Sequence, residues 1–244
     1  MTDAIKGTET KLLVDEFDFS GSTSSFDVVN NVTEEVSTTL GATAVTTAPI
    51  LPSMKITQNG YVSGVADAGT IQKELRDRLG VSGVYVAALL GTSIVNCSAF
   101  VLSDTFGASM QIQAPAAGLM TLNGAWGMGS GGYQGIRIYE GTLSATGNGT
   151  AYDIGSAGSA GGQAFLFVRS ITGTATSASI KVQSSTTEGG TYADEATLTF
   201  SAVGGYTAAM SGTVNRWLRI NTASLGGATN FTVTLIACVE GVTE

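Results

Sequence analysis

The sequence contains no histidine. A Ser-His-Asp triad, a cysteine nucleophile activated by histidine and an imidazole zinc ligand are therefore all excluded. The two cysteines, Cys97 and Cys238, lie too far apart in the sequence to indicate a structural zinc site. We predict that the chain is not an enzyme, and we expect no catalytic residue, no cofactor and no metal site.

Charged residues are also scarce, at 12 % of 244 residues, which is about half the usual share. They are too few to coat an isolated particle, and the 33 glycines and the mean hydropathy of +0.25 point the same way. We therefore expect much of the surface to be buried against neighbouring copies. The net charge of −8 argues against a protein that grips nucleic acid by its phosphates. It is compatible with a wall that DNA slides past without specific binding.

Long uninterrupted apolar segments are absent as well. The uncharged stretch 79–103 is divided by Ser82, Gly83, Gly91 and Asn96 into two strand-sized pieces, so we expect no membrane span. The first ten residues, MTDAIKGTET, are polar and of mixed charge, which is not typical of a secretion signal. We expect the chain to be made in a cytoplasm, where reduced cysteines are favoured over a disulfide.

Two groups of residues could carry chemistry. The densest carboxylate cluster consists of Asp15, Glu16 and Asp18, residue types that a hydrolase pair or a calcium site uses. Alternation along a strand places Asp15 opposite the other two, which favours an ordinary polar strand face. The run Gly127–Gly135 resembles a phosphate-binding loop, but it leads into a strand-like segment where such loops open a helix. We therefore favour a hairpin connection there.

Aromatic and basic side chains offer a further candidate surface. Trp126 and Trp217 could be platforms for sugar rings, but each lies in an apolar strand-like run, which favours a role as core anchors. Arg216 and Arg219 could pair with carboxylates of a neighbouring chain, although a solvated strand edge is the simpler interpretation.

One stretch has a helical pattern, within ADAGTIQKELRDRLG, and it predicts a helix over 70–79. Ile71, Leu75 and Leu79 recur every four residues, so we expect them to pack against a sheet. Five charged side chains at 73, 74 and 76–78 are expected to face solvent or the next subunit. Thr70 suits the N-cap position, and Gly80 suits the left-handed residue that follows a helix.

Residues 31–53 lack a clear periodicity and carry two of the three prolines, so we expect a long loop between a hairpin over 11–30 and a strand at 54–63. The apolar content of this segment is too high for simple disorder. An exposed apolar loop tends to mark a contact surface. We expect it to reach an adjacent subunit through the following side chains: Val36, Leu40, Val45, Pro49, Ile50, Leu51 and Pro52.

Most of the remaining chain consists of short alternating runs separated by glycine-bearing turns, which predicts a mainly β protein. Residues 1–145 are expected to form a first β domain, a barrel-like or sandwich sheet with the single amphipathic helix. The glycine-rich stretch 146–162 is expected to be a linker. Strand-like runs over 163–244 are spaced as in a β-sandwich, which would be the second domain.

The chain resembles a known family in two places. The first place is the segment LLVDEFDFSGSTSSFDVVN, together with the following EEVSTTLGATAVTTAPILPS and the strand MKITQNGYVSG. It resembles the opening of the major tail tube proteins of long-tailed bacteriophages with non-contractile tails. The β-sandwich region at the C-terminal end of many phage tail tube and virion proteins is similar to the ordered segments VQSS, TYAD and RWLR.

The resemblance implies a structural virion protein that self-assembles into hexameric rings stacked into a tail tube. Its partners would be copies of itself and other phage tail proteins at the tube ends. The phage genome would pass through the lumen during ejection without specific binding. The protein would be assembled in the host cytoplasm and would reside in the tail of the virion. The family has no catalytic set, so no functional residue is carried over.

Two other classes remain open. A virion decoration or head-fibre protein would share the β-rich, acidic and glycine-heavy composition, and it would bind a capsid surface without forming tubes. A carbohydrate-binding module or a carboxylate-only glycosidase would use Trp126, Trp217 and some of the acidic residues. Imaging of the purified protein and retention on a polysaccharide separate these classes.

Overall fold

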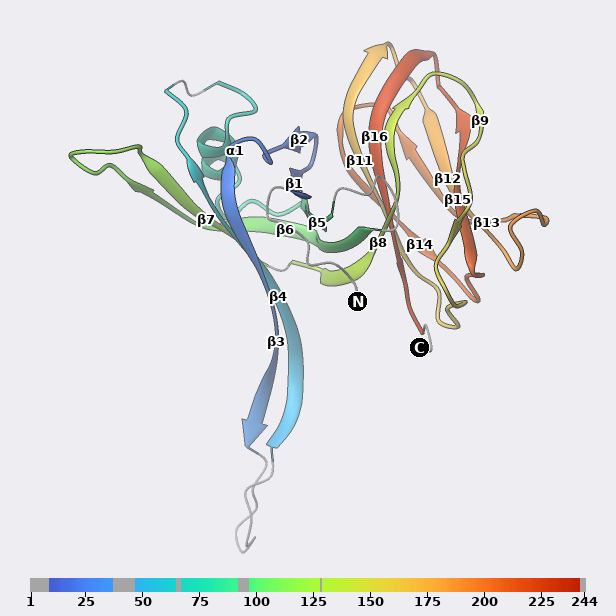
Figure 1. Ribbon diagram of the computed structural model, residues 1–244, viewed down its shortest axis with the longest axis horizontal. Coiled ribbons are helices and arrows are strands. Elements are labelled where there is room, and N and C mark those ends of the chain that lie inside the picture. Colours follow the sequence, from blue (N-terminus) through green and yellow to red (C-terminus); the bar gives the residue numbers. More distant parts are fainter. Residues whose placement is uncertain (1–8, 37–46, 65–66, 92–96, 128, 242–244) are drawn as a thin grey trace, which may run out of the picture. The chain divides into compact units, whose positions relative to one another are not determined.

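The computed structural model describes residues 9–36, 47–64, 67–91, 97–127 and 129–241. It confirms the expected fold class, because these residues form antiparallel β-sheets with one short helix among them (Figure 1). The chain folds as two compact units, which are interleaved in the sequence. In the described part of the chain, no helix is both long and apolar enough to cross a membrane.

Unit 1 combines the residues up to Gly21 with Tyr85–Val101 and the residues from Tyr133 onwards. One of its sheets has the order β14-β11-β16-β8-β6-β5-β1-β2, and the other has the order β10-β15-β12-β13 with β9 on β15. The bounds of these strands are as follows: β1 Thr10–Val14, β2 Phe17–Asp18, β5 Val84–Leu90, β6 Cys97–Gln113, β8 Gly131–Leu143, β9 Gly147–Asn148, β10 Tyr152–Asp153, β11 Gly162–Gly173, β12 Ala178–Ser185, β13 Ala193–Phe200, β14 Gly204–Met210, β15 Trp217–Ser224 and β16 Ala228–Val239.

Strand β11 shows why unit 1 is stable. Its even-numbered side chains, such as Leu166, pack into a core shared with Val182 and Leu218 of the second sheet. Its odd-numbered Phe165 and Phe167 pack on the other face with a second group of buried residues, which includes Leu13, Ala87, Leu89 and Cys97. A strand that is buried on both faces needs a continuous apolar run rather than alternation, which the sequence AFLFV supplies. Each of these large side chains contributes about 1.5–3 kcal/mol by its burial.

This arrangement differs from the domains expected from the sequence. Strands β1, β5 and the first part of β6 belong to the same sheet as β11 and β16, so the C-terminal sandwich is completed by residues from the first half of the chain. The stretch 146–162, expected to be a linker, carries β9 and β10, which both pair with β15. Both differences arise from pairing between strands that are distant in the sequence, which a local sequence pattern cannot predict.

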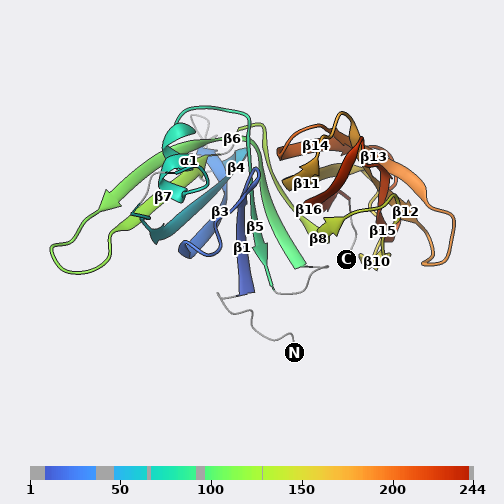
Figure 2. The same ribbon diagram turned by 90° about the horizontal axis from the view of Figure 1, so that it is seen from above.

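Unit 2 comprises Ser22–Val84 and Leu102–Gly132. Its sheet has the order β3-β4-β7-β6, in which β3 is Thr23–Val36, β4 is Thr47–Tyr61 and β7 is Thr121–Gly127, and the second half of β6 completes it. Helix α1, Ile71–Asp77, lies against this sheet (Figure 2). Trp126 is fully buried in this unit, which agrees with its expected role as a core anchor.

The long loop expected over 31–53 is wrong for residues 31–36 and 47–53, which are strand. The ladder between β3 and β4 runs from Thr23 opposite Gly60 to Val36 opposite Thr47. Strand β4 pairs with β7 over Lys55–Tyr61, so its earlier residues pair with β3 alone. Alternation of apolar and polar residues marks a strand that packs one face on a core, and a strand edge without a partner tolerates proline. The sequence pattern therefore gave no sign of strands at residues 31–36 and 47–53.

Helix α1 is shorter than predicted. Beyond Asp77 the chain leaves the helix to contact β6: the N–H of Gly107 donates to the carbonyl of Arg78, and the N–H of Gly80 donates to the carbonyl of Gly107. Ile71 and Leu75 are buried as expected, but Leu79 is 41 % exposed, so its assignment to the packed stripe is wrong.

The expectation that all five charges of this segment face solvent or the next subunit is wrong at Glu74. Its side chain is buried, accepts the N–H of Gly69 at 2.8 Å and pairs with Arg78. The carboxylate therefore satisfies a backbone donor at the start of the helix.

Candidate assembly surface

The sheet of unit 2 ends in two edges. Strand β3 pairs with β4 on one side only, so its other edge is unpaired along Thr23–Val36 among the described residues. Strand β6 pairs with β7 over Phe106–Gln113, and on its other side backbone contacts end at Gly107 within the same described set. An unpaired edge presents a row of N–H and C=O groups, which is a template for pairing with another chain.

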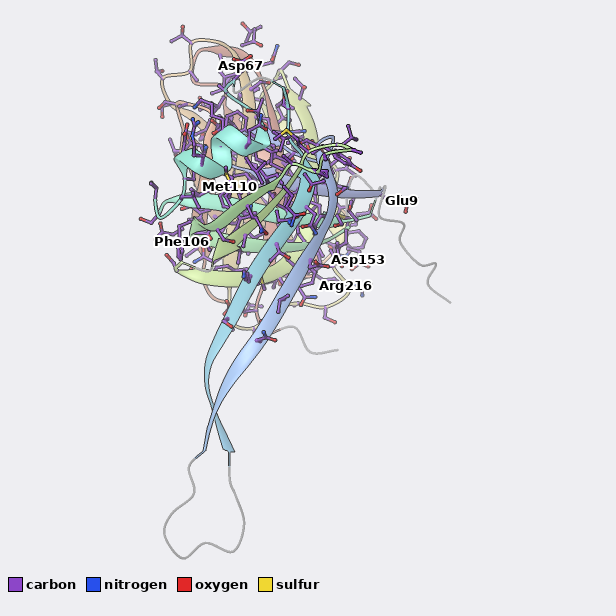
Figure 3. All side chains as sticks on the ribbon, turned by 90° about the vertical axis from the view of Figure 1, so that its left-hand side faces the viewer. Glu9, Asp67, Phe106, Met110, Asp153 and Arg216 are labelled. Atoms are coloured by element: carbon purple, nitrogen blue, oxygen red, sulfur yellow. The ribbon has the colours of Figure 1, made fainter. Side chains whose placement is uncertain are left out.

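Helix α1 covers one face of this sheet at close range. A Cβ on Gly124 would overlap Cδ2 of Leu75, and a Cβ on Gly107 would lie 3.0 Å from the carbonyl oxygen of Arg78. Met110 shares this face because it lies opposite Gly124 on β7, and Figure 3 shows it on the side of α1. Two glycines therefore let the helix backbone approach the sheet.

The opposite face of the sheet, which we call the open face, is mostly polar and almost uncharged, although Val29, Tyr61 and Phe106 also lie on it. Its register places Thr57 opposite Ala125, and Asn59 opposite Asn123. Among the described side chains of this face, the paired strands carry one acid, Asp27 of β3, and one base, Lys55 of β4. The remaining polar members are Ser25, Thr57, Asn59, Ser109, Gln111, Gln113, Thr121 and Asn123.

Beyond the part that pairs with β7, strands β3 and β4 continue as a two-stranded arm, Asn30–Val36 with Thr47–Met54. Figures 1 and 3 show it running past the end of β7. Of the residues expected to contact a neighbour, Val36, Pro49, Ile50, Leu51 and Pro52 lie in its two strands. Leu40 and Val45 lie outside the described residues.

An apolar tip at the turn between β6 and β7 was not found from the sequence. Leu119 is 70 % exposed, and Ile112, Met120 and the nearby Tyr61 of β4 are also exposed. Tyr61 lies opposite Thr121, next to Met120 in the sequence. The signal that could have revealed this tip is the stretch without charge between Asp104 and Arg137. Clustered exposed apolar side chains mark contact surfaces.

The carboxylate cluster near the N-terminus has a structural role. Asp15 adopts a positive φ of 48° between β1 and β2, and its Oδ1 accepts the N–H of Tyr85 at 2.9 Å. Asp18 accepts the N–H of Ser20 at 3.0 Å and faces Arg169 at 3.5 Å. Asp15 and Asp18 thus each hold their own chain in place, which is a structural role.

The run Gly127–Gly135 leads from strand β7 into strand β8 and not into a helix, unlike a phosphate loop. The expected hairpin is wrong, because in the described part of the chain β7 and β8 do not pair with each other and each pairs with β6. Arg216 pairs with Asp153 of the same chain at 2.5 Å, so the structure does not support its pairing with a neighbour. The guanidinium of Arg216 lowers the pKa of Asp153 to about 2. Trp217 is only half-buried on β15, unlike Trp126.

Unit 1 contains a buried charge cluster around Glu140 of β8. Its carboxylate faces Lys11 at 2.6 Å and Arg169 at 3.1 Å, and it also pairs with Arg137, whose side chain is 1 % exposed. Strands β1, β8 and β11 each contribute one or more of these residues. These ion pairs connect strands β1, β8 and β11 of the first sheet of unit 1, and a buried pair is costly to break.

Cys97 and Cys238 are free thiols, and both are buried in the same hydrophobic cluster as Phe165. Burial raises the pKa of each thiol above its ordinary value. In the described ranges, no group of three or more carboxylates and cysteines is placed to hold a metal ion.

No known family matches the chain, and no curated protein is similar to it in sequence. Several solved structures are similar to it, including the three that follow. The tail tube of phage SPP1 has a TM-score of 0.42 at 14 % identity, over 54 % of this chain and 78 % of that one. The baseplate of the anti-feeding prophage has a TM-score of 0.36 at 11 % identity, over 56 % and 96 %. The SPP1 Dit protein, described as a hub adsorption apparatus, has a TM-score of 0.35 at 10 % identity, over 93 % and 98 %. All three TM-scores lie below 0.5, so these likenesses do not establish a shared fold.

Proposed function

We propose that the chain is a structural subunit of a bacteriophage tail, and that the two unpaired edges of the unit 2 sheet join neighbouring copies into a ring. The observation that carries this proposal is the four-stranded order β3-β4-β7-β6, with an unpaired edge at each end in the described residues. Closing such a sheet on itself removes both edges.

The direction of the strands supports ring closure. All pairs in the sheet are antiparallel, so β3 and β6 run in opposite directions. Identically oriented copies placed side by side would then join β6 of one to β3 of the next as an antiparallel pair. Because two different surfaces meet, the interface is heterologous and repeats until the rotation closes. The resemblance in sequence to tail tube proteins suggests six copies.

In such a ring, the open face would line the lumen because α1 occupies the other face. The open face offers hydroxyl and amide groups with one described charge of each sign, Asp27 and Lys55. A wall of this kind gives the phosphates of a passing genome no basic stripe to bind. The same subunits, assembled in the host cytoplasm and resident in the virion tail, would then conduct DNA during ejection.

Rings also need contacts along the tube. The two-stranded arm is the strongest candidate, because an isolated two-stranded ribbon is only marginally stable in water. The apolar tip with Leu119 is a second surface whose burial would be favourable. We propose that the arm packs against an adjacent subunit, and that other tail proteins cap the tube at its ends.

Cysteine cross-linking tests the seam directly, because both natural thiols are buried. We would introduce Ser25→Cys on the open face of β3, together with Ser109→Cys, Gln111→Cys or Gln113→Cys on β6. Within one subunit these positions lie three strand spacings apart, about 14 Å, which is too far for a disulfide. We expect at least one pair to give a ladder of covalent oligomers that ends at the ring size.

The matched control combines Ser25→Cys with Thr199→Cys, an exposed position on β13 of unit 1. It should give no ladder at the same protein concentration. If the protein assembles and none of the three seam pairs forms a ladder, the edge-to-edge interface is wrong.

Negative-stain imaging tests the assembly itself. Tubes or rings are expected from the purified protein, whereas isolated particles that bind capsids would indicate a decoration or head-fibre protein. Deleting residues 37–50 should abolish normal tubes if the arm joins adjacent subunits. Normal tubes from this deletion would remove the arm from the proposal and leave the seam untouched.

A further inference from the structure

The outer face of the second sheet of unit 1 carries an organised set of polar and aromatic side chains. On β15, Leu218 and Ile220 point into the core, so alternation places Trp217, Arg219 and Asn221 on the opposite, outer face. The register sets Gln183 of β12 opposite Arg219, and Lys181 opposite Asn221. Asp194 of β13 lies opposite Gln183. We call these side chains, together with Tyr192, the outer platform.

The members of the outer platform hold one another in place. Nε of Arg219 donates to Oε1 of Gln183 at 2.9 Å, and Nε2 of Gln183 donates to Oδ1 of Asp194 at 2.7 Å. Nζ of Lys181 donates to Oδ2 of Asp194 at 2.5 Å. The guanidinium carbon of Arg219 lies 3.8 Å from the ring centre of Tyr192. Because these side chains are already ordered, a ligand would lose less entropy in binding to them.

The outer platform also keeps binding capacity. Of the three ammonium donors of Lys181 one is used, and the Nη groups of Arg219 have no hydrogen-bond partner among the described residues. Lys181 pairs with Asp194, whereas Arg219 bonds to the neutral amide of Gln183 and forms no ion pair among the described residues, so its guanidinium stays available to an acidic group. The half-exposed ring of Trp217 lies at one end of the row.

We propose that the outer platform is a binding site for an anionic polysaccharide. The Trp217 ring would stack on the apolar face of a sugar ring, since an indole offers a flat apolar surface beside polar groups. The Arg219 fork and the Lys181 ammonium would bind the acidic substituent, because a guanidinium matches a carboxylate with two parallel hydrogen bonds. The amides of Gln183 and Asn221 would bind hydroxyls.

Other ligand classes fit this face less well. A protein partner would need a central apolar patch with few charges, whereas here the two aromatic rings flank charged and amide side chains. Nucleic acid would need a basic stripe to neutralise several phosphates, and the two cations of the platform lie around one acid. An acidic sugar polymer matches both the flat ring and the isolated pair of cations.

Isothermal titration calorimetry of the whole chain with polygalacturonate oligomers tests the site, and dextran serves as the neutral probe. We expect binding to polygalacturonate that weakens at least about tenfold in Arg219→Ala, which loses the charge-assisted hydrogen bonds to the acidic group, and in Trp217→Ala, which loses the stacking surface. Arg219→Lys keeps the charge but loses the fork, so we expect it to be intermediate. The matched control is Arg76→Ala, which removes the same charge from an exposed position in unit 2.

Circular dichroism melting curves of each variant show whether it folds, and Lys181→Ala replaces any variant that does not. The proposal is overturned if polygalacturonate does not bind, if dextran binds as tightly, or if Arg76→Ala weakens binding as much as Arg219→Ala. Tube formation is recorded separately for Arg219→Ala and should be unchanged. The outer platform and the assembly proposal can therefore fail independently.

Discussion

The contact between helix α1 and β7 can be tested by a double-mutant cycle on Leu75 and Gly124. Leu75 is fully buried, so Leu75→Ala should lower the free energy of unfolding of unit 2 by about 3–5 kcal/mol. Gly124→Ala adds a methyl group where Cδ2 of Leu75 lies, so overpacking should cost about 1–3 kcal/mol. In the double variant the new methyl group occupies the space that Leu75 leaves.

The double variant should therefore be more stable than the sum of the single effects predicts, by about 1–2 kcal/mol. Unfolding in urea would be followed by tryptophan fluorescence in a Trp217→Phe background, where buried Trp126 reports on unit 2 alone. The matched control is Leu79→Ala, which should cost less than about 1 kcal/mol because this side chain is half-exposed. The reasoning is refuted if the two substitutions are additive, or if Leu79→Ala costs as much as Leu75→Ala.

Three other perturbations test the buried charge cluster, the thiols and an exposed ion pair. Glu140→Gln should lower the free energy of unfolding by about 3–5 kcal/mol in urea titrations, because it removes the carboxylate that faces the buried arginine of β8; a cost below 1 kcal/mol would contradict this. Cys97 and Cys238 should react with Ellman's reagent about 100-fold more slowly in the native protein than in urea, since burial raises the pKa of each thiol; rapid native labelling would show that the core opens. Asp153 should titrate with a pKa of about 2 in NMR spectra, and its pKa should rise in Arg216→Ala towards the ordinary value while the N–H of Gly155 still lowers it. Since this pKa is lowered in the folded chain, its contribution to stability is complete above the ordinary value and is lost as the pH falls towards 2.

The helix and the strands show where local sequence pattern is informative. The spacing of Ile71 and Leu75 predicted both the helix and its buried side, because a helix on a sheet has one face in contact and a 3.6-residue period. Leu79 satisfied the same spacing but lies outside the helix, because Arg78 and Gly80 pair with β6 instead. A competing backbone contact from a distant strand is not recorded in the local pattern.

The candidate sites divide in the same way. The apolar residues of the arm drew attention to 31–53 from composition, but their pairing into two strands comes from the ladder with β3, which a local sequence pattern cannot predict. Trp217 and Arg219 drew attention in the sequence, but their grouping with Tyr192, Gln183 and Asp194 did not, because these residues come from separate segments that only the register of β12, β13 and β15 aligns.

The sequence by itself determined the chemistry that is excluded, the mainly β class, the existence of one amphipathic helix and the shortage of charge that calls for buried surface. These properties follow from composition and local periodicity, which each residue carries with it. The tertiary structure alone decided how the chain divides into two interleaved units, which edges of the unit 2 sheet stay unpaired and which polar side chains meet on the outer platform. These properties depend on hydrogen bonds between strands that are distant in sequence, and the choice of partner strand is a property of the whole fold.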